Sequence, residues 1–124
     1  MFEAWDMISG RLHPELGGKP EYLDVIGVNF YDRNQWVHMV GTLHRDDPQY
    51  RPFREILTEV YERYRRPVFV AETGPADAER PAWFNYVFSE VMAAMRQGGP
   101  MEGAVAYPFL KHAGWVGGRH GQHG

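Results

Sequence analysis

One carboxylate stands at the end of a short apolar run and is followed by a turn-forming glycine. The run covers residues 68–71 and leads directly into Glu72, with Gly74 two positions later. Apolar runs of this length, bounded by proline and glycine, are typical of buried strands in parallel sheets. Side chains at the carboxyl ends of such strands face the cleft in which α/β proteins bind ligands. Glu72 is therefore a candidate catalytic residue, and the alternative is a solvated acid that caps the turn after the strand.

A second strand-like segment also ends in polar side chains. Residues 23–31 read LDVIGVNFY and are almost continuously apolar or β-favouring. Because side chains alternate along a strand, Asn29 and Tyr31 are expected on one face, and Val28 and Phe30 on the face that meets the helices. The alternative for the polar pair is structural, with an amide that satisfies backbone groups and a phenol at the core boundary.

If the two strands are neighbours, Glu72 lies beside a phenol and an amide. Strict alternation along residues 68–72 sends Val68, Val70 and Glu72 to one face. In retaining glycoside hydrolysis a carboxylate attacks the anomeric carbon. A tyrosine hydroxyl such as that of Tyr31 can orient the carboxylate, and an amide such as that of Asn29 can bind the sugar 2-hydroxyl.

Apolar residues at three- and four-residue steps predict two helices. The first covers residues 53–64, and the second opens at Pro81 and stops before residues 98–100, which read GGP. A third strand is expected over residues 103–107. The order strand, helix, strand, helix, strand predicts right-handed crossovers and a parallel sheet.

The fold class is therefore α/β, and a partial (β/α)8 barrel with about three parallel strands and two intervening helices is favoured over an open doubly wound sheet. The long loops, 32–52 and from Lys111 onward, both follow strands, as the functional face of a barrel requires. No glycine-rich nucleotide or phosphate motif follows any strand. Residues 1–116 are expected to form the barrel-like domain, and residues 117–124 a flexible tail rich in glycine and histidine.

The chain is short for a barrel. A complete barrel takes ~250 residues, whereas this chain has 124. The outer edges of the first and third strands would present unpaired backbone groups. We therefore expect the chain to self-associate through these edges, to be covered, or to be marginally stable.

Composition excludes several classes of partner. The formal net charge is −3, with acids and bases interspersed, so nucleic acid and anionic membrane surfaces are not expected partners. The absence of cysteine removes disulfides and thiolate metal sites and fits a reducing cytoplasm. No run reaches the ~20 apolar residues of a membrane helix.

Two further groups of residues have competing interpretations. Trp36 and Trp115 lie in expected loops, where an indole stacks on a sugar ring or covers the top of the barrel.

Histidines suggest a metal site, but the pair His120 and His123 lies in a glycine-rich terminus that cannot preorganise one. No metal and no cofactor is predicted. The other histidines considered are His38, His44 and His112.

The two strand motifs resemble a known family. Residues 24–31 (DVIGVNFY) and 67–74 (PVFVAETG) are similar to the sixth and seventh strands of family 1 β-glucosidase-type glycoside hydrolases, whose forms are roughly D-x-I-G-x-N-Y-Y and P-I-x-I-T-E-N-G. The resemblance implies that Glu72 is the nucleophile, that Tyr31 contacts it and that Asn29 lies near the sugar. The expected third strand, with Tyr107-Pro108 and the downstream Trp115, is similar to the eighth strand and its aromatic loop.

Two departures from the family pattern define the hypothesis. Thr73 replaces the usual asparagine after the nucleophile, and the Asn-Glu pair that carries the family's general acid/base does not occur in this chain. The chain thus resembles the carboxyl-terminal part of a retaining glycosidase, carbohydrate is the expected partner, and the isolated chain is expected to be nearly inactive. The alternatives are a non-catalytic carbohydrate-binding or interaction protein and a truncated product without its own activity.

Overall fold

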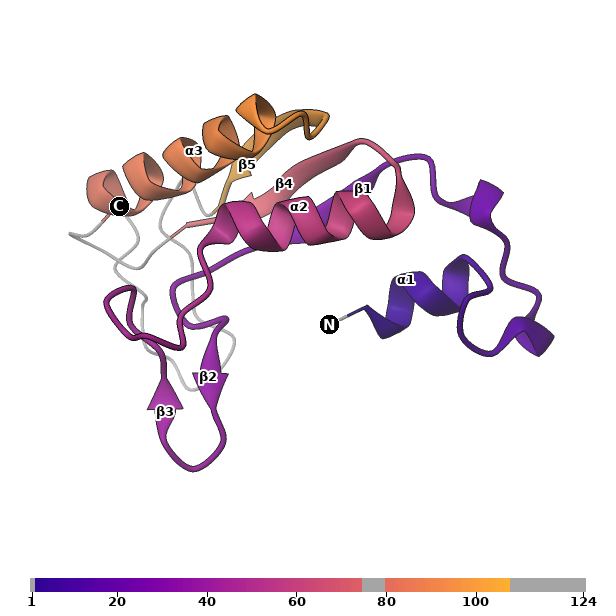
Figure 1. Cartoon of the computed structure of the whole chain (residues 1–124), viewed down its shortest axis with the longest axis horizontal. Coiled ribbons are helices and arrows are strands. Elements are labelled where there is room, and N and C mark those ends of the chain that lie inside the picture. The colour runs from indigo at the N-terminus through magenta and orange to yellow at the C-terminus, as the bar shows by residue number, and fades with distance from the viewer. Residues whose placement is uncertain (1, 75–79, 108–124) are drawn as a thin grey trace.

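The computed structural model describes residues 2–74 and 80–107, which form three helices and five strands within those ranges (Figure 1). The expectations for Trp115 and for the tail 117–124 lie outside the described residues. In the described part no helix combines the length and apolar character needed to cross a membrane. The elements in chain order are α1 (Glu3–Ile8), β1 (Ile26–Asn29), β2 (Trp36–Val37), β3 (Gly41–Thr42), α2 (Phe53–Tyr64), β4 (Val68–Thr73), α3 (Arg80–Arg96) and β5 (Met101–Ala106), with short 3-10 turns at Pro14–Leu16 and Pro20–Tyr22.

Three parallel strands form the main sheet in the order β1-β4-β5. α2 connects β1 to β4, α3 connects β4 to β5, and both helices lie against the same face of the sheet (Figure 1). This arrangement confirms the predicted α/β fold class and the partial barrel. α2 has the predicted bounds, α3 begins one residue before the predicted proline, and β5 begins two residues before the predicted start.

Two regular segments were not predicted. The loop 32–52 contains a small antiparallel hairpin of β2 and β3, which projects away from the main sheet (Figure 1). Near the amino terminus, α1 contacts the carboxyl-terminal end of α2. There the buried carboxylate of Asp6 accepts hydrogen bonds from the Arg63 guanidinium at 2.5 and 3.0 Å and from the Tyr64 hydroxyl at 2.8 Å. The Arg63 hydrogen bonds hold the pKa of Asp6 below its usual range.

The core lies between the main sheet and its two helices. Val28 and Phe30 of the β1 segment are buried there, as the alternation predicted, and Val68 and Val70 of β4 are fully buried beside them. The opposite face of the sheet is more open, since Val105 of β5 is 50% exposed. In a complete barrel that face would line the interior.

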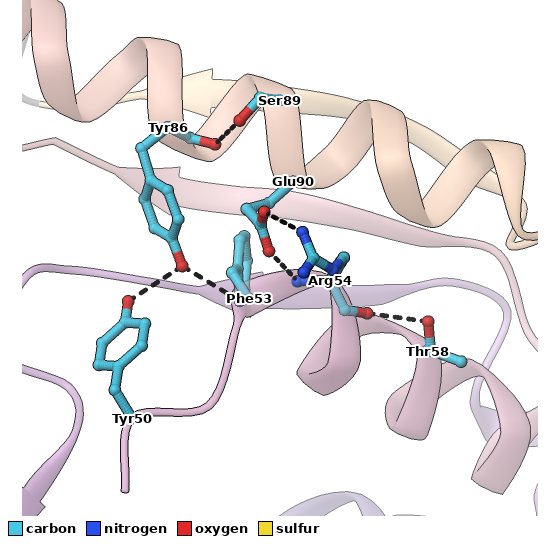
Figure 2. Close-up of polar contacts among 7 residues, drawn as sticks. All are labelled: Tyr50, Phe53, Arg54, Thr58, Tyr86, Ser89 and Glu90. Carbon is cyan, nitrogen blue, oxygen red and sulfur yellow. Dashed lines mark hydrogen bonds and ion pairs between the residues drawn. The ribbon is translucent and has the colours of Figure 1, made fainter. Parts of the chain in front are cut away.

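Side chains of α3 accept hydrogen bonds from the backbone N–H groups at the amino terminus of α2. No side chain within α2's own segment caps this end. Instead, the backbone N–H of Phe53 donates to the Tyr86 hydroxyl at 3.2 Å, and the backbone N–H of Arg54 donates to Glu90 Oε2 at 3.0 Å (Figure 2). The Arg54 guanidinium also donates to Glu90 Oε1 at 2.8 Å, and the hydroxyls of Tyr50 and Tyr86 lie 3.1 Å apart. These bonds fix α2 against α3, because orphan N–H groups at a helix start require partners.

We predict that Glu90→Gln lowers the free energy of unfolding by about 1–2 kcal/mol, because the side chain then loses either the cap on the Arg54 N–H or the hydrogen bond from the Arg54 guanidinium. The amide oxygen of the new glutamine can accept from either the backbone N–H or the guanidinium of Arg54. Its amide nitrogen then faces the other of these two donors, from which it cannot accept. Arg54 is 41% exposed, so the ion pair itself adds little. Urea unfolding followed by circular dichroism measures the change. Glu62→Gln, at an exposed position of α2, is the matched control and should change stability little; equal effects in both variants would contradict the capping role.

Candidate active site at the carboxyl ends of β1 and β4

Three predicted site residues meet at the carboxyl ends of β1 and β4. The Tyr31 hydroxyl donates a hydrogen bond to Glu72 Oε1, and the Asn29 amide Nδ2 donates to Glu72 Oε2 at 3.0 Å. Both carboxylate oxygens are therefore held by neutral donors from the neighbouring strand. Glu72 and Tyr31 are half-buried, and Asn29 is exposed. The carboxylate is thus oriented while its surroundings remain open to a ligand.

An irregularity in β4 places Glu72 on this face. Val28 pairs with Val70, and Asn29 pairs with Glu72, so Ala71 is an extra residue without a partner on β1. Such a bulge shifts the alternation of the following side chains. The prediction that Glu72 shares a face with Val68 and Val70 was therefore wrong. Those valines are fully buried beneath the helices, whereas Glu72 lies on the opposite face with Asn29 and Tyr31.

Gly27 leaves room for the extra residue. A Cβ atom at Gly27 would lie 2.9 Å from the Cβ of Ala71 and 3.2 Å from the ring of Phe69. Contacts this short are not tolerated in a packed interior. The glycine in the β1 segment is therefore part of the arrangement that lets β4 bulge beside it and present Glu72 to Asn29.

A turn after β1 fixes the backbone of Tyr31. The Tyr31 N–H donates to Asn34 Oδ1 at 2.5 Å, and the Asn34 N–H donates to the Tyr31 carbonyl at 3.1 Å. Reasoning from the sequence missed Asn34 as a supporting residue. The signal available was weak, since asparagine three positions after a strand end is common in turns of every kind.

Burial and the neighbouring carboxylate raise the pKa of Tyr31. Loss of hydration is the largest cause, followed by the hydrogen bond to Glu72 and then by the negative charge of Glu72. The phenol consequently stays protonated far above neutral pH. It serves the site as a hydrogen-bond donor and not as a base.

Trp36 lies in the hairpin and not in the main sheet. Its side chain is 63% exposed, and its ring centroid lies 6.5 Å from that of His38. The structure does not place it with the cluster of Asn29, Tyr31 and Glu72. Its role in sugar stacking stays a prediction.

Two cavities flank the end of β1. One of about 320 Å³ is lined by Asn29 together with Asn34, Gln35 and Arg51. The other, about 390 Å³, is lined by polar residues of the loop after β1 and by Trp83. Both volumes fall within the ~300–1,000 Å³ typical of small-molecule sites. Over residues 2–74 and 80–107 no cluster of three or more histidine, aspartate or glutamate side chains is arranged to hold a metal ion.

The three parallel strands and their two intervening helices form part of a (β/α)8 barrel, and solved β-glucosidase structures share this fold. A β-glucosidase from Thermotoga maritima in complex with azafagomine aligns with a TM-score of 0.62 and 20% identity, covering 94% of this chain and 35% of that chain. The same organism's β-glucosidase in complex with deoxynojirimycin gives a TM-score of 0.63 at 19% identity, covering 95% of this chain and 35% of that chain.

A third similar structure is a Thermotoga maritima family 1 glycoside hydrolase complexed with a cyclophellitol analogue transition state mimic. It gives a TM-score of 0.59 at 20% identity, covering 90% of this chain and 33% of that chain. The chain therefore spans about a third of the length of these structures. No protein-family model and no curated protein matches the sequence.

We predict that the Tyr31 phenol titrates above the ordinary tyrosine value of 10.0. Glu72→Gln should lower this pKa, because the charge is removed, but not below 10.0, because burial is the largest cause. Since the folded-state pKa is raised, the stability that the neutral phenol provides is complete below pH 10 and lost as the pH rises through the folded-state value.

The measurement is a ¹⁹F NMR titration of the chain with 3-fluorotyrosine at position 31, both with and without Glu72→Gln. N-acetyl-3-fluorotyrosine amide in the same buffer is the reference for fluorotyrosine in water. A position-31 label that titrates together with this reference would show that the phenol is neither buried nor bonded to the carboxylate.

Proposed function

We propose that this chain is the nucleophile-bearing part of a retaining β-glycosidase and corresponds to strands six to eight of the barrel. The observation that carries the proposal is the Glu72 carboxylate, held by Tyr31 and Asn29 at the carboxyl ends of adjacent parallel strands. The active sites of (β/α)8 enzymes lie at this end of the barrel. The similarity of fold to β-glucosidases agrees with this position.

Glu72 would act as the nucleophile. One carboxylate oxygen attacks the anomeric carbon, the bond from that carbon to the leaving oxygen breaks, and the electron pair departs with the leaving oxygen. Water then cleaves the glycosyl ester and regenerates the carboxylate. Each oxygen of Glu72 accepts one hydrogen bond from the protein, and a carboxylate oxygen has a second lone pair with which to attack.

Tyr31 and Asn29 would orient Glu72 and contact the sugar. The raised pKa of Tyr31 keeps its hydroxyl a donor throughout the reaction. Asn29 uses one amide N–H on Glu72, which leaves the carbonyl oxygen and a second N–H for a sugar hydroxyl. A 2-hydroxyl bound in this way strengthens its hydrogen bond as charge develops at the anomeric carbon.

The general acid/base would come from the remainder of the barrel. Retaining hydrolysis needs two carboxyl groups about 5–5.5 Å apart, and the sequence lacks the Asn-Glu pair that carries the second group in the family it resembles. In the described sheet β1 and β5 are edge strands, which offer backbone groups for further strands. Additional βα units, on the same or another polypeptide, would pair there and complete the site. Without them we expect little turnover.

We predict that Glu72 becomes covalently labelled by a 2-deoxy-2-fluoro-glucoside with a dinitrophenolate leaving group. Such a leaving group needs no protonation, so the missing acid is bypassed, and the fluorine slows hydrolysis of the ester. Intact mass and peptide mapping should find one slow adduct on Glu72. Glu72→Gln should abolish it, and Glu102→Gln, at an exposed position of β5, should retain it. An adduct on a different carboxylate, or no adduct on a folded chain, would contradict the assignment.

A second candidate function is carbohydrate binding without catalysis, favoured by the 63% exposure of Trp36. An exposed indole on a hairpin is suited to stack on a sugar ring. If the chain acts as a glycosidase, we expect glucosides to quench tryptophan fluorescence. Glu72→Gln should then weaken glucoside binding about tenfold, because one charge-assisted hydrogen bond is lost. Trp36→Ala tests whether the Trp36 indole on the hairpin contributes to sugar binding. Equal affinity in wild type and Glu72→Gln, with loss in Trp36→Ala, would favour the binding function over the glycosidase.

A further inference from the structure

Thr73 links the strand that carries Glu72 to two other elements. It is the last residue of β4 and is fully buried on the face opposite to Glu72. Its hydroxyl donates a hydrogen bond to the Phe30 carbonyl at 2.7 Å and accepts one from the Trp83 indole N–H at 2.9 Å. One side-chain oxygen thus joins β4 to the end of β1 and to α3.

Phe30, the residue before Tyr31, is fixed by backbone hydrogen bonds and by contacts of its ring. Its backbone N–H donates to the Glu72 carbonyl at 2.9 Å. Its ring is stacked on that of Phe53 in α2, with centroids 3.8 Å apart, and on that of Trp83 in α3, with centroids 5.6 Å apart. The Thr73 hydroxyl closes this arrangement. Any displacement of Phe30 along β1 would move the Tyr31 hydroxyl relative to the carboxylate.

The β-ladder is irregular on both sides of this link. The β1–β4 register shifts between Val28 and Asn29, and the β4–β5 register shifts between Val70 and Thr73. A bulge interrupts the regular ladder hydrogen bonds. The hydrogen bond from the Thr73 hydroxyl to the Phe30 carbonyl, just past the bulge, therefore fixes the ends of β1 and β4 relative to each other. Threonine suits this position because its hydroxyl donates and accepts at once and its methyl group fills the buried space.

We propose that Thr73 is a positioning residue that sets the Tyr31–Glu72 hydrogen bond through its bridge between Phe30 and Trp83. The catalytic significance of this role rests on the function proposed above, but the geometric effect does not. Thr73 is fully buried on the face opposite to Glu72, and Trp83 lines the cavity formed by the loop after β1. Both would therefore act on the Tyr31–Glu72 pair through the residues beside them in the chain or in the core.

The test compares Thr73→Val, which keeps the shape but removes the hydroxyl, with Thr73→Ser, which keeps the hydroxyl. The first readout is the ¹⁹F titration of 3-fluorotyrosine at position 31, and the second is the rate at which the fluoroglucoside labels Glu72. In Thr73→Val we expect the pKa of position 31 to move toward that of free fluorotyrosine amide and labelling of Glu72 to slow at least tenfold. Thr73→Ser should keep both values near wild type.

Trp83→Phe provides a second variant if Thr73→Val fails to fold. It removes the indole donor together with part of the buried ring that is stacked on Phe30, so we expect a change of the same sign in both readouts. Circular dichroism and urea midpoints confirm that each compared variant is folded. A folded Thr73→Val or Trp83→Phe variant with the wild-type titration would overturn the proposal, as would a Thr73→Ser variant that behaves like Thr73→Val.

Failure of this proposal is distinguishable from failure of the proposed function. If Glu72 is not a nucleophile, no variant is labelled, yet the position-31 titration still reports whether Thr73 positions Tyr31. If Thr73 has no positioning role, the titration is unchanged in Thr73→Val while wild type is still labelled at Glu72.

Discussion

The hydrogen bonds from Tyr31 and Asn29 to Glu72 are the interaction on which the rest of the site depends. A half-buried carboxylate loses hydration and is stable only when donors replace the water. Asn29 is the last residue of β1, Tyr31 lies two residues beyond it, and the acceptor comes from β4, so the cluster exists only if the two strand ends keep a fixed register. The bulge at Ala71, the space at Gly27 and the bridge at Thr73 all act on that register.

The two faces of the sheet have different requirements. On the helix face, side chains of α3 accept hydrogen bonds from backbone N–H groups of α2. Glu90 and Tyr86 thereby serve as the cap that α2 lacks in its own segment. On the site face, β5 stays exposed and two strand edges are unpaired within the described sheet. A barrel buries such a face only when all its strands are present. The chain therefore has a packed outer layer and an incomplete interior, which agrees with its coverage of about a third of the similar structures.

Local patterns allowed much of the fold to be predicted. The bounds of α2 followed from apolar residues at helical spacing, and the burial of Val28 and Phe30 followed from alternation along β1. The short hairpin of β2 and β3 escaped prediction because two-residue strands carry no periodic signal. Val68 and Val70 were predicted on the same face as Glu72, and this was wrong because a bulge inserts one residue without any change in apolar character. The predicted proximity to Tyr31 and Asn29 nevertheless holds.

The sequence by itself determined which side chains stand at strand ends, because apolar runs and turn residues are local properties of the chain. It also determined that two helices alternate with the strands, since helical periodicity is visible in single segments, whereas the tertiary structure placed both helices on one face of the sheet (Figure 1). Only the tertiary structure decided that a bulge at Ala71 pairs Glu72 with Asn29, and that Thr73 joins Phe30 to Trp83. These relations connect residues 10 to 43 positions apart. They depend on a one-residue shift in register, which is settled by the packing of both strands together and not by either strand alone.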